Sequence, residues 1–280
     1  MESREPFCRE AGAGPGVVCI HSNASSSSQW RALMDRLAAK FHVLAADSYG
    51  AGNGPPWPAG RSVALRDEVA LLEPVFARAG NPFTLVGHSY GAAVALIAAL
   101  QRPDRIRALL LYEPAMFALV DAASPPPNDA QGIRATVAAA AAALAAGQRS
   151  AAAEVFIDYW MGAGSWRRMP EPRRAPIEAC IVNVQGWADA LFNEPTPLSA
   201  LRALEMPVLL MVGTNSPASS RAVARLLTGA FQNLQLVEFD GLGHMGPITH
   251  PEVVNAAIET FLRAAQLRAP RSAPACGSRR

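Results

Sequence analysis

The sequence has few cysteines and no closely spaced pair of them. Its 280 residues include only four, Cys8, Cys19, Cys180 and Cys276, and none of them forms a C-x-x-C motif. Zinc sites and redox motifs use closely spaced thiols, so neither is predicted. We expect no metal and no organic cofactor.

Long apolar runs are also missing. No stretch is long enough to span a bilayer, and residues 1–6 are charged and lack the apolar core of a signal peptide. These two absences predict a protein without membrane contact that is located in the cytoplasm.

Charged residues are scarce as well, since they make up 17% of the chain and give a formal net charge of +2. The body of the chain has no cluster of Lys and Arg interleaved with aromatic residues. Nucleic-acid binding needs such a cluster on a folded surface, so it is not predicted. Several arginines fall instead in the last stretch, and residues 267–280 are predicted to be a disordered basic tail.

Apolar residues are abundant, at half of the chain, which is enough for a compact core. Each of several short runs rich in β-branched and aliphatic residues is followed by loop residues and, in most cases, by a helical pattern. These predicted strands are 17–20, 41–46, 82–86, 106–111, 207–212 and 234–239. Strands that alternate with helices predict an α/β fold, with a mostly parallel central sheet and helices on both of its faces.

A long segment interrupts this alternation after the fourth predicted strand. It opens with three consecutive prolines and carries helical patterns at 138–144, 154–160 and 177–192. We predict a helical cap over residues 115–200, inserted before the penultimate strand. The core around it is predicted to comprise residues 7–114 and 201–266, with a closing helix over 251–263.

A G-x-S-x-G motif, Gly87-His88-Ser89-Tyr90-Gly91, stands between a predicted strand and a helical stretch. A sharp strand-to-helix turn holds such a serine in a strained backbone conformation and exposes its hydroxyl above the sheet. The flanking glycines let neighbouring chain pass without a clash. The motif therefore predicts Ser89 as a nucleophile rather than as an ordinary serine of a Gly-rich turn.

Three further motifs follow predicted strands in a familiar order: His21-Ser22-Asn23, Asp47-Ser48-Tyr49-Gly50-Ala51-Gly52 and Gly243-His244. With these motifs the chain from about residue 7 to residue 263 resembles the α/β-hydrolase superfamily. The resemblance implies the fold and a serine hydrolase. It does not imply the substrate, because this scaffold carries esterases, lipases, lactonases, C–C bond hydrolases and cofactor-free perhydrolases.

A serine hydroxyl needs a base within hydrogen-bond reach, and in the resembled family this base is a histidine after the last strand. His244 has that position, in a loop whose neighbouring glycines allow it to bend toward Ser89. We predict His244 as the general base. His21 and His88 belong to the loop motifs and are expected to orient the backbone.

The expected acid departs from the family pattern. The acid usually follows the strand that here ends at Val212, but residues 213–217 contain no carboxylate, and Ser216 stands where the aspartate would. Glu113, after the strand that precedes the cap, is predicted to be the acid instead. Some relatives of this fold carry their acid there, and the order nucleophile, acid, base is kept.

This assignment predicts a distance of about 2.6–3.2 Å between a carboxylate oxygen of Glu113 and Nδ1 of His244. The alternatives are that Glu113 only caps a loop or pairs with an arginine of the cap. In that case Asp240 is the next choice for the acid, or the site has none.

Acyl transfer also needs donors for the developing oxyanion. The backbone amides of Tyr90, directly after the nucleophile, and of Asn23, after the first predicted strand, are predicted to supply them. Ser22 replaces the glycine that usually follows His21, and its Cβ is expected to restrict this loop.

The substrate pocket is predicted between Ser89 and the cap, because ligands of open α/β folds bind at the carboxyl ends of the strands. Trp160 and Trp187 are the predicted substrate contacts, and the alternative is that they form the core of the cap. We expect the cap to control access and specificity rather than chemistry.

Together these residues predict a serine hydrolase that acts on a small to medium ester or related acyl substrate through an acyl intermediate on Ser89. A C–C bond hydrolase or a cofactor-free perhydrolase would use the same triad. A non-catalytic ligand-binding protein that kept the fold and lost the acid is the alternative from another class. A small-molecule substrate is the expected partner, and the sequence leaves a homodimer open.

Overall fold

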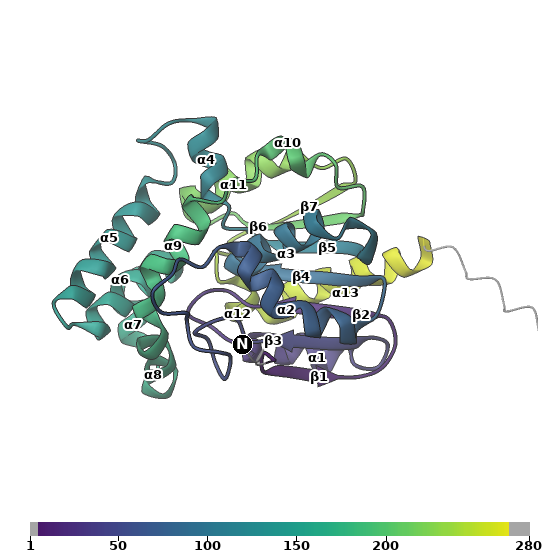
Figure 1. Cartoon of the computed structure of the whole chain (residues 1–280), viewed down its shortest axis with the longest axis horizontal. Coiled ribbons are helices and arrows are strands. Elements are labelled where there is room, and N and C mark those ends of the chain that lie inside the picture. The colour runs from purple at the N-terminus through teal and green to yellow at the C-terminus, as the bar shows by residue number, and fades with distance from the viewer. Residues whose placement is uncertain (1–4, 269–280) are drawn as a thin grey trace, which may run out of the picture.

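The computed structural model describes residues 5–268, which form a seven-stranded sheet with helices on both faces (Figure 1). The strands lie in the order β1-β3-β2-β4-β5-β6-β7. β1 runs antiparallel to β3, and all other neighbours are parallel. The strands are β1 (Cys8–Ala11), β2 (Gly16–Ile20), β3 (His42–Ala46), β4 (Phe83–His88), β5 (Ile106–Tyr112), β6 (Val208–Gly213) and β7 (Leu234–Phe239).

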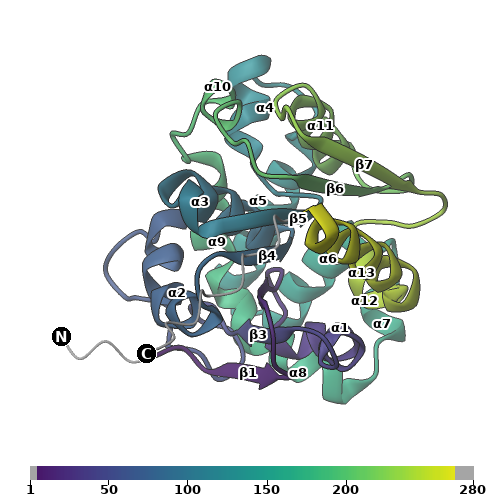
Figure 2. The same cartoon turned by 90° about the vertical axis from the view of Figure 1, so that its right-hand side faces the viewer.

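The helices that follow the strands cover the two faces of the sheet. Figure 2 shows α1 and α13 on one side of the sheet and α2 and α3 on the other. The core helices are α1 (Arg31–Leu37), α2 (Leu65–Ala79), α3 (Tyr90–Gln101), α11 (Ala218–Thr228), α12 (Gly246–Thr249) and α13 (Pro251–Arg268). Short 3-10 turns are η1 (Ser27–Trp30), η2 (Pro103–Arg105) and η3 (Ile181–Asn183).

The continuous apolar runs of the central strands follow from burial on both sides. In β2, Val18 and Ile20 belong to the core beneath α2 and α3, whereas Val17 and Cys19 belong to the core beneath α1 and α13. All four side chains are completely buried. A strand that alternates between two buried faces needs apolar residues at every position, and the sequence pattern reflects this requirement.

The cap is a group of helices between β5 and β6. Figure 1 shows α5 to α9 gathered at one end of the sheet. This end carries the active-site turn, because the cap helices and Ser89 line the same cavity. The cap helices are α4 (Phe117–Ala123), α5 (Gln131–Ala145), α6 (Arg149–Met161), α7 (Ser165–Arg168), α8 (Glu171–Cys180), α9 (Val184–Phe192) and α10 (Leu198–Leu201).

The structure differs from the sequence-based expectation in one strand and two boundaries. β1 was not predicted, because its residues are largely polar and only half-buried at the sheet edge. The predicted boundary between residues 200 and 201 falls inside α10. α13 continues through Arg268, past the predicted end at 263 and two residues into the predicted tail, and residues 269–280 lie outside the described residues.

Within residues 5–268, no helix combines the length and the apolar character needed to cross a membrane.

Candidate active site

Ser89 lies in the sharp turn between β4 and α3. Its backbone has φ 55° and ψ −116°, a conformation that side-chain-bearing residues rarely adopt. The flanking glycines are needed for close packing. A Cβ on Gly87 would lie 2.5 Å from the Cα of Ala92, and one on Gly91 would lie 2.4 Å from the carbonyl oxygen of His21. The turn therefore has the geometry predicted from the motif.

His244, in the loop after β7, brings its ring to this serine. Its Nε2 lies 2.9 Å from Oγ of Ser89, and its side chain is buried. The loop is held by Tyr112, whose hydroxyl donates a hydrogen bond of 2.8 Å to the carbonyl oxygen of Gly243. Gly246 is required here, because a Cβ on it would lie 2.2 Å from the Tyr112 hydroxyl.

Glu113 completes a continuous chain of hydrogen bonds. Its Oε2 lies 2.7 Å from Nδ1 of His244, which confirms the predicted distance. Its Oε1 accepts hydrogen bonds from the amide of Gly213 at 2.7 Å and from the hydroxyl of Ser216 at 2.5 Å. Glu113 has φ 44°, so a strained backbone conformation accompanies this placement. Ser216, the residue in the usual acid position, thus supports the carboxylate instead of replacing it.

Asp240 does not take part in this chain. Its side chain is exposed, and its Oδ1 accepts a hydrogen bond of 3.3 Å from Oγ1 of Thr214. The geometry therefore favours Glu113 over Asp240 as the partner of His244.

Ser220, in α11, is a second partner of Nδ1 that the sequence analysis did not identify. Its buried hydroxyl lies 3.1 Å from Nδ1 of His244. Ser220 stands on an amphipathic helix that carries no recognisable motif, so the sequence holds no signal for this contact.

The two histidines of the loop motifs orient the backbone, as expected. Nδ1 of His21 donates to the carbonyl oxygen of Ser22 at 2.7 Å, and its Nε2 accepts from the amide of Ser48 at 3.1 Å. His88 donates from Nε2 to the carbonyl oxygen of His244 at 2.8 Å. Burial lowers the pKa of both rings, and the charge of His244 lowers that of His88 further, so both are neutral.

Gln29 links the loop after β2 to this arrangement. It donates to Nδ1 of His88 at 3.1 Å, and its Oε1 accepts from the amide and the hydroxyl of Ser22 at 3.2 and 3.1 Å. The side chain of Ser22 thus anchors the loop. The strained residue of this loop is Ala24, with φ 52°, rather than Ser22, where a restriction was expected.

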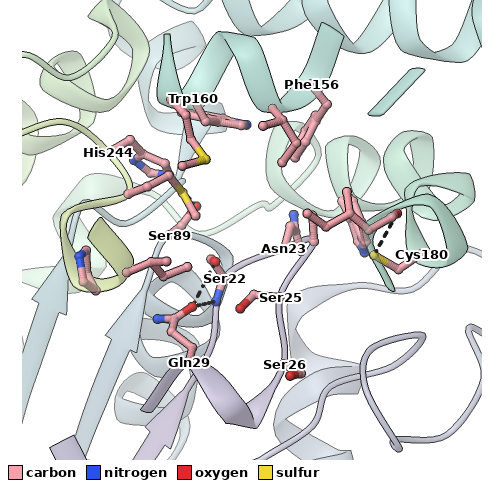
Figure 3. A pocket seen from close by; sticks show the side chains of 18 of the residues that line it. Ser22, Asn23, Ser25, Ser26, Gln29, Ser89, Phe156, Trp160, Cys180 and His244 are labelled. Carbon is pink, nitrogen blue, oxygen red and sulfur yellow. Dashed lines mark hydrogen bonds between the residues drawn. The ribbon is translucent and has the colours of Figure 1, made fainter. Parts of the chain in front are cut away.

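The two predicted oxyanion donors lie on the active-site side of the fold. Tyr90 is the first residue of α3, so its amide has no acceptor within the helix. Asn23 lines the same cavity as Ser89. Figure 3 shows Ser89 and His244 beneath Trp160, with Ser22 and Asn23 on the opposite wall.

The cavity next to Ser89 has a volume of about 550 Å³ and two chemically different parts. Trp160 and Trp187, the predicted substrate contacts, both line its cap side, together with Phe117, Phe156, Leu191 and Phe192. The segment after β2 lines the cavity with polar residues, namely Ser25, Ser26, Ser28, Gln29 and Arg31, and α8 of the cap adds Arg173.

The arginine and carboxylate content of the described cavity lining is of one sign. Arg31 and Arg173 are exposed, and within residues 5–268 neither forms an ion pair. The described lining contains no aspartate and no glutamate. In the same range, no group of three or more His, Cys, Asp or Glu side chains is arranged to hold a metal ion.

Several relatives match the chain over nearly its whole length. The 2-(acetamidomethylene)succinate hydrolase of Mesorhizobium japonicum is 28% identical over 260 residues, which are 91% of each chain. The pimeloyl-[acyl-carrier protein] methyl ester esterase of Aeromonas hydrophila is 25% identical over 271 residues, covering 90% of this chain and 96% of that one. An uncharacterized protein of Mycobacterium tuberculosis is 34% identical over 108 residues, and the chain spans only about 30% of its length.

A solved structure and a family model agree with this fold. The crystal structure of an alpha/beta hydrolase from Sphaerobacter thermophilus superposes with a TM-score of 0.70 at 25% identity, over 91% of this chain and 95% of that chain. The family model of the alpha/beta hydrolase fold matches residues 15–251. The chain therefore belongs to the α/β-hydrolase family.

Proposed function

We propose that this chain is a serine hydrolase that cleaves a small to medium ester or related acyl substrate through an acyl intermediate on Ser89. The observation that carries the proposal is the unbroken chain from Ser89 through His244 to Glu113, with contacts of 2.9 and 2.7 Å. A buried acid, an imidazole and a hydroxyl in this order are what nucleophilic acyl transfer requires.

In the proposed first half-reaction, Oγ of Ser89 attacks the acyl carbonyl while its proton passes to Nε2 of His244. The carboxylate of Glu113 stabilises the imidazolium that forms, and the amides of Tyr90 and Asn23 stabilise the oxyanion. The tetrahedral intermediate collapses as the imidazolium gives its proton to the leaving oxygen. Water, activated by His244, then hydrolyses the acyl-Ser89 ester and restores the free serine.

The two parts of the cavity support a finer proposal for the substrate. The aromatic and aliphatic residues of the cap accommodate a short or medium carbon chain, and Arg31 and Arg173 favour an anionic group in the cavity. The absence of a carboxylate from the described lining removes repulsion against such a group. The Mesorhizobium relative is named for a substituted succinate, which fits an anionic substrate.

The complete acid, base and nucleophile chain favours an enzyme over a non-catalytic binding protein. C–C bond cleavage and perhydrolysis on the same triad remain second candidates. The esterase activity named for the Aeromonas relative favours an ester here.

A fluorophosphonate probe tests the proposal, because it reacts only with an activated serine. The wild-type protein should be labelled on Ser89, and Ser89→Ala should not react. Ser25→Ala, which removes another serine of the same cavity, should still be labelled. Ser89→Ala and His244→Ala should each lower turnover of an activated ester by about a thousandfold or more, since triad members fail as a unit. A folded wild-type protein that the probe leaves unlabelled would refute the proposal.

A further inference from the structure

Trp160 of the cap stacks on the ring of the proposed base. The ring centroids of Trp160 and His244 lie 4.1 Å apart, and the planes are inclined by 30°. Figure 3 shows the indole directly above His244 and Ser89. The contact joins a residue of the inserted cap to a loop after the last strand of the core, so it exists only when the cap lies against the core.

Several contacts fix the indole in this position. Trp160 is nearly buried, and its ring meets Tyr159 edge-on at 4.7 Å and Phe156 at 6.2 Å. The hydroxyl of Tyr159 shares a hydrogen bond of 2.9 Å with Ser219, at the start of α11. Since the next residue, Ser220, contacts Nδ1 of His244, the same helix supports both the indole and the imidazole.

The groups around His244 leave one face of its ring to Trp160. Glu113 and Ser220 lie at Nδ1, and Ser89 lies at Nε2. The ring of His88 is 5.2 Å away and remains neutral because of its burial. The positive charge that develops on His244 is therefore met by a carboxylate at the ring edge and by an aromatic surface over the ring face.

We propose that Trp160 is a positioning residue for His244, which holds the imidazole toward Ser89 and stabilises the imidazolium formed when Ser89 gives up its proton. The inference rests on the proposed role of His244 as general base. An aromatic face attracts a cation more strongly than a neutral ring, so the contact favours the transition state over the ground state. The cap thereby contributes to the chemistry and not only to substrate selection, in contrast to the expectation from the sequence.

Trp160→Leu and Trp160→Phe test the inference, with Trp166→Leu as a matched control. Trp166 is another buried indole of the cap, it lies outside the cavity, and its ring stacks with Arg174. The measurements are the rate of Ser89 labelling by a small fluorophosphonate, and kcat and KM for p-nitrophenyl acetate and octanoate. Thermal melts identify the variants that are folded at the assay temperature.

Trp160→Leu should lower kcat by about two- to thirtyfold, by the same factor for both esters and for labelling, with little change in KM. The acid limb of the kcat/KM profile should move to lower pH, because the imidazolium has lost a stabilising contact. Trp160→Phe should recover most of the loss, and Trp166→Leu should label at the wild-type rate.

Labelling of Trp160→Leu at the wild-type rate, or a change confined to the octanoate KM, would overturn the inference while leaving the proposed function intact. A Trp160→Phe protein that is folded but no better than Trp160→Leu would also overturn it. If the wild-type protein is not labelled on Ser89, the proposed function itself fails.

Discussion

The carboxylate of Glu113 lies 2.7 Å from Nδ1 of His244, although 131 residues separate the two in the sequence. Both side chains are almost completely buried, so their charges are poorly screened by solvent. Glu113→Gln should keep the shape of the site and lose the charge that supports the imidazolium. We expect kcat to fall by about a hundred- to ten-thousandfold, with the fold retained.

The matched control for this prediction is Asp240→Asn, which removes an exposed carboxylate near the same loop. It should retain kcat within about twofold, as expected for a surface substitution. Near wild-type turnover in Glu113→Gln, combined with a large loss in Asp240→Asn, would reverse the assignment of the acid.

The effect of Ser216→Asp should depend on the residue at position 113. With Glu113 present, the new carboxylate would lie against Oε1, which the Ser216 hydroxyl now contacts at 2.5 Å. Two buried carboxylates at this distance cannot both ionise, so the single variant should lose activity and stability. In the Glu113→Gln background, the same aspartate restores a negative charge near His244, and kcat should rise about tenfold or more over Glu113→Gln alone.

A double-mutant cycle in kcat and in the free energy of unfolding measures this dependence. The same sign for Ser216→Asp in both backgrounds would show that positions 113 and 216 do not share the role of the acid.

The sequence predicted every strand of the sheet except the edge strand β1, together with the residues in its turns, because each of these follows a local pattern. Ser89 and His244 stand next to glycines that the turn requires, and the missing carboxylate near Ser216 directed attention to Glu113. The contacts of Trp160 and Ser220 with His244 were not predicted. They depend on how the cap and α11 pack on the core, and no local pattern encodes that packing.

Glu68, in α2, should make stability depend on pH. Burial raises the pKa of its carboxyl group to about 8, and it is contacted by the Tyr90 hydroxyl at 3.2 Å and the Tyr49 amide at 3.3 Å. The unfolded chain ionises this group at a lower pH, near 4.5. The contribution of Glu68 therefore lowers the free energy of unfolding increasingly as pH rises from about 4.5 to about 8.

Glu68→Gln removes this penalty and should raise the free energy of unfolding by on the order of a few kcal/mol at pH 8, with the gain shrinking toward pH 5. Urea denaturation at several pH values measures it. Glu73→Gln, in the same helix, removes a half-buried carboxylate paired with Arg102 and Arg105, and it should not give a gain that grows with pH. A pH-independent effect of Glu68→Gln would contradict the raised pKa.

Gly91→Ala should destabilise the active-site turn, because its Cβ would lie 2.4 Å from two backbone carbonyl oxygens, those of Ile20 and His21. Ile20 is the last residue of β2 and His21 follows it directly, so neither carbonyl can move without disturbing the central sheet. We expect a loss of about 3 kcal/mol or more and loss of Ser89 labelling. Gly229→Ala is the control, since its nearest neighbour would be 3.8 Å away and its φ is −86°. It should be neutral or stabilise by up to about 1 kcal/mol.

The last prediction concerns the charge of the substrate. Monomethyl adipate and dimethyl adipate carry the same methyl ester on the same carbon chain, but only the first has a free carboxylate. If Arg31 and Arg173 bind an anionic group, kcat/KM should favour the monomethyl ester, and added salt should reduce this preference by screening the exposed charges. Arg31→Gln combined with Arg173→Gln should lower the ratio of the two kcat/KM values by about tenfold.

Arg149→Gln provides the control, because Arg149 is an exposed arginine of the cap that does not line the cavity. It changes the net charge by the same amount as one of the two substitutions, so it separates local binding from the general field of the protein. It should leave the ratio unchanged. Since dimethyl adipate has no charge to lose, its turnover should persist in the double variant. An unchanged ratio of the two kcat/KM values in the double variant would mean that Arg31 and Arg173 do not recognise an anionic group. Turnover of both esters would still support the serine hydrolase.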